Sequence, residues 1–182
     1  MFFQHLKGPL EALLFASGDP VPGDRLAQIL EVPVAHVESM IAEMQQAMTV
    51  DERGLTIVAV AGGYQLCTKP QLADTVEKLA EIQDNRLSSA ALETLAIIAF
   101  KQPITRQEIE SIRGVKVDRV VHTLTERQLI KEIGRKDAIG RPILYGTTTE
   151  FLKCFGLKTL KELPDLADYL NVMEEQQGKQ PD

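Results

Sequence analysis

The sequence predicts a mostly α-helical chain with small β-hairpins, an α+β fold made of two winged helix-turn-helix domains in tandem. Three observations support this prediction: an internal repeat, apolar residues at helical spacing, and short β-rich runs that meet at glycines. The 182 residues are enough for two small domains. A hydrophobic content of 44% and a charged content of 25% are ordinary for a globular protein.

The internal repeat relates the two halves of the chain. Leu10–Leu13 is similar to Leu92–Leu95, and the apolar positions from Pro20 to Val37 are similar to those from Pro103 to Val120, at an offset of 83 residues. A period of this length indicates a duplicated small domain, because solenoid repeats have periods of about 20–50 residues. We therefore expect an N-terminal domain, a C-terminal domain and a partly disordered tail, over residues 1–84, 85–164 and 165–182.

In the first copy, the pattern predicts three helices, a hairpin and a further helix. Gly18 and Pro20 should end the first helix, and Pro33 should be the first residue of the third. Gly62-Gly63 suits the tight turn of the hairpin that begins at Leu55. The third helix should bury Val34, Val37, Ile41, Met44 and Met48. The helix after Pro70 should bury Leu72, Val76 and Leu79.

The second copy repeats this plan with clearer boundaries. Ser88 or Ser89 can cap its first helix, and Thr105 with Glu108 forms a capping box for its second, which Gly114 ends. The first helix should carry Leu92, Leu95 and Ala99. The wing that follows has a polar tip over residues 134–140, and its return strand begins at Pro142.

Charge is divided unevenly along the chain. Residues 1–84 hold 5 basic and 12 acidic residues, residues 85–163 hold 14 and 9, and residues 164–182 hold 1 and 5, which gives −7, +5 and −4. The predicted third helix of the first copy contains no Lys or Arg, which disfavours DNA binding because DNA affinity depends on cationic phosphate contacts. The basic second copy leaves three interpretations open: a solvated surface, a site for an acidic protein segment, and direct DNA contact.

Several functional classes lack support in the sequence. Cys67 and Cys154 have no metal-ligand or redox spacing, and the three histidines are scattered, so we expect no disulfide framework and no metal. No phosphate-binding loop or pair of catalytic carboxylates is evident, so we expect neither enzymatic activity nor a cofactor. The N-terminus is unlike a signal peptide and no run reaches about 20 apolar residues, so we expect a cytoplasmic protein without membrane contact.

Two long segments of the second half carry a family resemblance. Leu87–Gly114 and Gly134–Thr148, the latter containing Gly-Arg-Pro-Ile-Leu-Tyr-Gly, resemble segregation and condensation protein B, and so do Leu10–Gly18 and Gly62–Leu66 in the first half. The resemblance covers nearly all of residues 6–164.

Two positions depart from the family pattern. Phe100 stands where a tyrosine is expected, and Gly23 stands where a serine or threonine would help to start the second helix. We expect Asp24 to take over this capping role.

The resemblance implies a non-catalytic accessory subunit of the bacterial SMC–kleisin complex, which acts in chromosome condensation and segregation during cell division. It implies a homodimer, formed mainly through the N-terminal domains, that binds the kleisin, segregation and condensation protein A. The kleisin in turn connects it to the SMC ATPase, so that DNA contact is indirect or weak and the protein is associated with the nucleoid. The alternative function is a tandem winged-helix transcriptional regulator that binds DNA directly.

Candidate interface residues are the aromatic and arginine side chains, because these types dominate binding energy at protein interfaces. Tyr64, which follows the hairpin turn, is the candidate for the dimer interface. For the aromatic residues the alternative is packing within their own domain, and Arg141 could instead brace its own wing. The candidates for partner binding are Arg113, Arg135, Arg141, Tyr145, Phe151 and Phe155.

Overall fold

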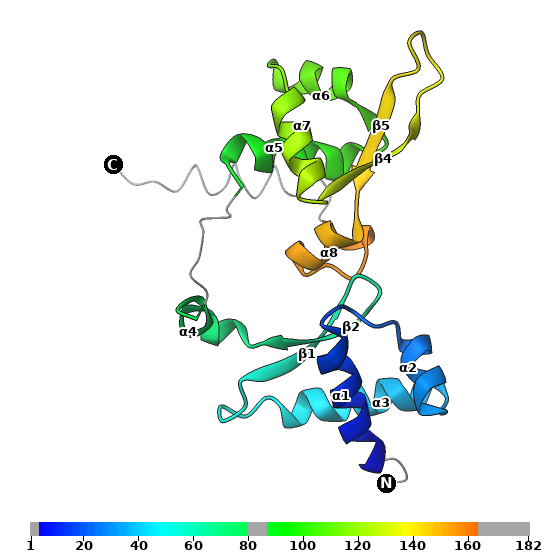
Figure 1. Ribbon diagram of the computed structural model, residues 1–182, viewed down its shortest axis with the longest axis vertical. Helices are drawn as coiled ribbons and strands as arrows, with labels where there is room; N and C mark the ends of the chain where they lie inside the picture. Colours follow the sequence, from blue (N-terminus) through cyan, green and yellow to red (C-terminus); the bar gives the residue numbers. More distant parts are fainter. Residues whose placement is uncertain (1–3, 80–86, 164–182) are drawn as a thin grey trace. The chain divides into compact units, whose positions relative to one another are not determined.

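The computed structural model describes residues 4–79 and 87–163 (Figure 1). The chain divides into two compact units, Met1–Asn85 and Arg86–Asp182, each with its own hydrophobic core. Helices and small antiparallel sheets make up both, which confirms the mixed α+β class. The tail that we expect to be partly disordered lies outside the described residues.

The N-terminal unit consists of helices followed by a β-hairpin and a short last helix. Gly18, with a φ of 65°, follows α1 as its C-cap and ends this helix as predicted. Pro33 is the N-cap of α3 rather than its first residue. The elements are η1 (Gln4–Leu6), α1 (Lys7–Ser17), α2 (Gly23–Leu30), α3 (Val34–Ala47), β1 (Leu55–Val60), β2 (Gly63–Thr68), η2 (Pro70–Leu72) and α4 (Ala73–Glu77).

The core of this unit is formed by α1, α2, α3 and one face of the hairpin. Its most deeply buried side chains are Leu10, Leu14, Leu26, Val37, Ile41 and Ile57. Val34 is 40% exposed, contrary to the prediction for the α3 stripe, because it is the first residue of the helix and lies beyond the covered turns. Met40 occupies a core position that the prediction missed.

The predicted buried face after Pro70 is wrong. Leu72, Val76 and Leu79 are 36%, 40% and 88% exposed. The helix α4 has only five residues, which is too short to cover the unit with an apolar face of about two turns.

The hairpin turn lies one residue earlier than predicted. Val60 pairs with Gly63, so the turn residues are Ala61 and Gly62, and both have positive φ (50° and 75°), as a type I′ turn requires. Gly63 belongs to the strand, where a Cβ atom would lie 2.7 Å from the carbonyl carbon of Val21. Its missing side chain therefore allows the segment before α2 to lie directly against β2.

The prediction that Asp24 caps α2 is also wrong. The N-cap is Pro22, which has no side-chain hydrogen bond, and the Asp24 carboxylate accepts a hydrogen bond of 2.9 Å from the backbone N–H of Arg25. Because the helix begins at Gly23, Asp24 already lies inside its first turn, too late in the chain to act as a cap.

The C-terminal unit has three helices, a three-stranded antiparallel sheet with strand order β3-β5-β4, and a last helix. Ser88 caps α5, Thr105 and Glu108 form the predicted capping box of α6, and Gly114 ends that helix in the left-handed conformation. The elements are α5 (Ser89–Lys101), β3 (Ile104–Thr105), α6 (Arg106–Arg113), α7 (Asp118–Glu126), β4 (Ile130–Arg135), β5 (Ile143–Thr147), α8 (Thr149–Phe155) and η3 (Leu160–Glu162).

The core of this unit lies between α5, α6, α7 and the sheet. Its most deeply buried side chains are Leu95, Ile98, Ile109, Val117, Leu124 and Ile130. Leu92 is 46% exposed, because the buried face of α5 runs through Ala91, Leu95 and Ile98. Both units have the order of three helices and a hairpin on which the winged-helix prediction rests.

Candidate partner-binding surface

An arginine-rich basin lies at the loop end of the β4–β5 hairpin in the C-terminal unit, beside the start of α6, with a volume of about 250 Å³. The residues that line it are Arg106, Gln107, Arg135, Gly140, Arg141, Pro142, Ile143 and Tyr145. Three of the predicted candidates, Arg135, Arg141 and Tyr145, are thus brought together in one place. The lining contains three guanidinium groups and no carboxylate, so the basin is suited to an anionic group.

Local backbone structure shapes the wing side of the basin. Arg141 has a φ of 40°, a left-handed conformation that turns the chain into β5. The Arg135 guanidinium donates a hydrogen bond of 3.2 Å to the carbonyl oxygen of Arg141, and the Lys136 N–H donates one of 2.8 Å to the carbonyl oxygen of Pro142. These two contacts hold the strands together near the tip, so Arg141 does brace its own wing through its backbone.

A second contact ties the wing to α6. The Lys136 ammonium lies 2.6 Å from the carboxylate of Glu108, which also accepts hydrogen bonds from the backbone N–H and the hydroxyl of Thr105. The hydrogen bond from Lys136, followed by those from Thr105, lowers the pKa of Glu108 from 4.5 to about 2. The capping box therefore also positions the wing beside the N-terminus of α6.

The side chains of the basin differ in how far they are already engaged. Arg106 forms an ion pair with Asp118, whereas no carboxylate in the described part of the chain pairs with the exposed Arg141 guanidinium. Burial, followed by the charge of Glu132, raises the pKa of Tyr145, so its phenol remains a neutral hydrogen-bond donor at physiological pH. Guanidinium groups beside a phenol can bind a carboxylate by several charge-assisted hydrogen bonds.

Arg113 lies outside the lining of the basin. Its side chain is only 14% exposed, and its guanidinium donates to the Ala90 carbonyl oxygen (2.7 Å) and the Thr94 hydroxyl (2.8 Å) and pairs with Glu93 at 3.2 Å. These contacts join α6 to α5 within the unit. Its donors are therefore largely engaged, and its predicted contact with a partner stays a prediction.

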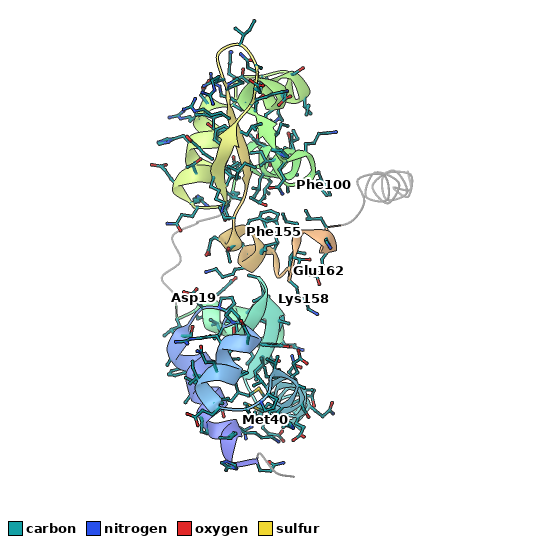
Figure 2. The ribbon with its side chains drawn as sticks, turned by 90° about the vertical axis from the view of Figure 1, so that its right-hand side faces the viewer. Asp19, Met40, Phe100, Phe155, Lys158 and Glu162 are labelled. Carbon is teal, nitrogen blue, oxygen red and sulfur yellow. The ribbon has the colours of Figure 1, made fainter. Side chains whose placement is uncertain are left out.

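The two phenylalanines of α8 differ in exposure although they are one turn apart. Phe151 is 3% exposed and belongs to the core, whereas Phe155, which is labelled in Figure 2, is 48% exposed. Their ring centroids are 4.8 Å apart, with an interplanar angle of 37°. The buried Phe151 ring thus packs against the Phe155 ring, and of the two only Phe155 is exposed enough to contact a partner.

Tyr64 is half-buried and packs against the core of the N-terminal unit. Its backbone exchanges two hydrogen bonds of 2.9 Å with Val21. In the second copy, Tyr145 is the register partner of Ile104 in the antiparallel pair of β3 and β5, and Val21 and Ile104 are 83 residues apart, which is the offset of the repeat. The two predicted tyrosines are therefore structural equivalents.

The residue beside each tyrosine distinguishes the two copies. Gly23 in the first copy corresponds to Arg106 in the second. A Cβ atom on Gly23 would lie 3.4 Å from the Tyr64 ring, whereas Arg106 lines the basin together with Tyr145. Arg106 was not among the predicted candidates because its segment was interpreted only as a capping box, although the repeat offset identifies the substitution.

The described residues offer little else that resembles a functional centre. None of their His, Cys, Asp and Glu side chains gather in a group of three that could hold a metal ion. None of the helices within the described ranges is long and apolar enough to span a bilayer.

The fold and the basin together define a two-unit α+β protein whose C-terminal unit presents an arginine-rich basin. The family model for "Segregation and condensation complex subunit ScpB" matches residues 8–166. Segregation and condensation protein B of Moorella thermoacetica is 56% identical over 167 residues, which cover 92% of this chain and 86% of the relative. That of Symbiobacterium thermophilum is 52% identical over 164 residues, which cover 90% and 75%. The chain therefore belongs to the ScpB family of segregation and condensation complex subunits.

The chain is also similar to proteins of solved structure. ScpB from Mycobacterium tuberculosis is 38% identical, and the match covers 86% of this chain and 98% of that one with a TM-score of 0.42. A dimer of the ScpB N-terminal domain complexed with an ScpA peptide is 35% identical, and the match covers 43% of this chain and 98% of that one with a TM-score of 0.41.

Proposed function

We propose that this chain is a non-catalytic accessory subunit of the bacterial SMC–kleisin complex and acts with it, at the nucleoid, in chromosome condensation and segregation. The family match over residues 8–166 supports this role. The chain forms a homodimer that binds the kleisin ScpA, and it reaches the SMC ATPase through the kleisin. For one family member, the N-terminal domain is described as a dimer complexed with an ScpA peptide.

The two halves divide these tasks in the proposal. The domain of residues 1–84 dimerises and that of residues 85–164 binds the kleisin, each as a winged helix. The charge distribution supports this division, because the N-terminal domain has a net charge of −7 and the segment 85–163 has +5. A kleisin segment with acidic side chains is attracted by the second.

The observation that carries the kleisin-binding part is the convergence of Arg135, Arg141 and Tyr145 on one basin. A carboxylate of the kleisin binds there between the guanidinium groups and accepts a hydrogen bond from the Tyr145 phenol. Arginine is suited to this contact because its planar group donates two parallel hydrogen bonds. Phe155 adds exposed apolar area elsewhere on the same unit.

The test compares charge reversals on the full chain. The first variant carries Arg135→Glu and Arg141→Glu, and the control carries Arg119→Glu and Lys161→Glu, which change the net charge equally at exposed positions outside the basin. Arg113 is left unchanged because its contacts hold α6 to α5. Affinity for the central segment of ScpA is measured by calorimetry, and the assembly by size-exclusion chromatography with light scattering.

The wild-type dimer should shift to a larger stable species on addition of the ScpA segment. The basin variant should bind at least about tenfold more weakly, the scale of a lost charge-assisted contact, and the control should change by less than about twofold. Equal affinities of both variants would overturn the assignment of the basin, and the absence of any shift by the wild type would overturn the kleisin-binding function.

The alternative function, a DNA-binding regulator, is tested by its salt dependence. Binding of labelled duplex DNA should weaken steeply as salt rises, since released counterions dominate such affinity. Binding of a kleisin segment with more apolar contact area should weaken much less. A salt-sensitive complex with DNA, together with no complex with ScpA, would favour the regulator.

A further inference from the structure

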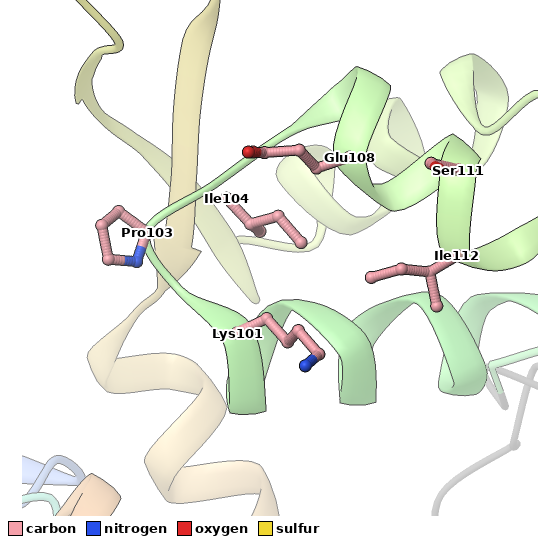
Figure 3. A pocket seen from close by; sticks show the side chains of 6 residues that line it. All are labelled: Lys101, Pro103, Ile104, Glu108, Ser111 and Ile112. Carbon is pink, nitrogen blue, oxygen red and sulfur yellow. The ribbon is translucent and has the colours of Figure 1, made fainter.

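A groove of about 400 Å³ lies between α5 and α6 of the C-terminal unit (Figure 3). Ile104 forms its buried base, and Ile112 on α6 and Lys101 on α5 lie on either side. Ile112 is 50% exposed, although isoleucine is normally buried in a domain of this size. The described residues that line it are Lys101, Pro103, Ile104, Glu108, Ser111 and Ile112.

The charged residues of the groove indicate what it can bind. The carboxylate of Glu108 is already engaged by Thr105 and Lys136, so it does not attract a cation. No carboxylate within residues 4–79 and 87–163 pairs with the exposed Lys101. A suitable occupant therefore has apolar side chains for the base and an acidic side chain for Lys101.

The last segment of this chain has both properties in its sequence. Leu166, Tyr169, Leu170 and Met173 follow the spacing i, i+3, i+4, i+7, which is typical of one face of an amphipathic helix that binds in a groove. Acidic residues are interspersed among them and follow them, and residues 164–182 have a net charge of −4, against +5 for residues 85–163. The acidic residues of the segment 165–175 are Asp165, Asp168, Glu174 and Glu175.

The attachment point of this segment favours binding within the same unit. Leu163 is the last described residue, and it packs against the core cluster that also contains Ile104. A segment tethered this closely has an effective concentration on the order of millimolar, so even a weak contact would be well occupied.

We propose that residues 165–175 bind in the α5–α6 groove of their own C-terminal unit, with the apolar side chains on Ile104 and Ile112 and an acidic side chain near Lys101. This contact is independent of the proposed function. It makes the groove a surface that is covered by the chain itself and can be uncovered by a competitor.

The test uses full-length variants and a fluorescent peptide of residues 164–182, whose binding is followed by anisotropy. Leu166→Ser with Leu170→Ser removes two apolar anchors from the chain's own segment, and Val172→Ser is the control because it lies off the apolar spacing. The peptide should bind the double variant at least about tenfold more tightly than the wild type or the control, because a tethered competitor is lost.

A second pair of substitutions in the double variant locates the contact. Ile112→Glu should abolish peptide binding, whereas Leu92→Glu should preserve it, because Leu92 has similar exposure (46%) but does not line the groove. The proposal is overturned if the peptide does not bind the double variant, if it binds the wild type equally well, or if both glutamate variants lose binding alike. A change of molar mass in the double variant, seen by light scattering, would assign the groove to the segment of a second copy and overturn binding within one unit.

Discussion

At the scale of single residues, glycine is required at position 63 because the backbone of Val21 lies close to it, and not because of a left-handed φ. A Cβ atom at Gly63 would lie 2.7–3.0 Å from three backbone atoms of Val21, whereas one at Gly62 would meet open space but a φ of +75°. Gly63→Ala should lower the free energy of unfolding by about 2–3 kcal/mol, as overpacking does, and Gly62→Ala by about 1 kcal/mol, as left-handed strain does. Urea unfolding measures both, and a larger loss for Gly62→Ala would contradict the packing argument.

The capping box of α6 makes stability depend on pH. The folded pKa of Glu108 is about 2 and its ordinary value is 4.5. Because the folded pKa is the lower one, the carboxylate stabilises the fold fully above about pH 4.5, and this contribution is lost as the pH falls toward 2. Glu108→Gln should therefore flatten the decline of unfolding free energy in this window, which urea titrations at several pH values can measure. An unchanged slope would show that folding does not lower the pKa of Glu108.

The other member of the capping box is Thr105, which is 2% exposed. Thr105→Ala should cost about 1–2 kcal/mol of unfolding free energy, because it removes the cap of Glu108 N–H and one of the donors to its carboxylate. Thr105→Ser keeps the hydroxyl and should recover most of this loss. If serine is no better than alanine, the methyl group rather than the hydroxyl carries the effect.

At the scale of elements, Arg113 stabilises the contact between α5 and α6. Its three acceptors are the Ala90 carbonyl, the Thr94 hydroxyl and the Glu93 carboxylate. Arg113→Lys should reduce the free energy of unfolding by about 1–2 kcal/mol, because an ammonium cannot reproduce the planar set of donors. Unfolding and ScpA affinity should be measured together. A loss of affinity without a loss of stability would restore Arg113 to the partner surface.

Most elements could be predicted from the sequence, and the errors have local causes. Helix boundaries at Gly18, Ser88 and Gly114 followed from capping chemistry, which depends only on neighbouring residues. The prediction of a buried face for the helix after Pro70 was wrong because the spacing of apolar residues does not reveal how short that helix is. Similarly, a Gly-Gly pair does not show which of its members is in the turn, since the register of β1 and β2 decides this.

At the scale of the whole molecule, the two cores share no residue, so the units should unfold separately. Leu124→Ala should lower the opening free energy of the C-terminal unit by about 2–4 kcal/mol and leave the N-terminal unit unchanged, and Leu14→Ala should do the reverse. Hydrogen exchange followed by mass spectrometry resolves the two units. Loss of protection in both units of either variant would show that they fold as one.

The candidate surface could be predicted only in part, because its residues come together through the fold. The residue types identified Arg135, Arg141 and Tyr145, but nothing in the sequence separated them from Arg113, whose donors are used internally. Phe151 and Phe155 share one helix face and were indistinguishable until the core was known. Which of the two is exposed depends on long-range packing, and a local sequence pattern carries no information about that packing.

The correspondence of Gly23 and Arg106 has a consequence for what each half can recognise. In the first half, a Cβ atom at Gly23 would already contact the Tyr64 ring, so a side chain as long as arginine would have to pass around that ring. In the second half, the equivalent position supplies a guanidinium group to an open basin on the same backbone plan. The two halves can therefore differ in specificity through one side chain beside a shared tyrosine, without any change of fold.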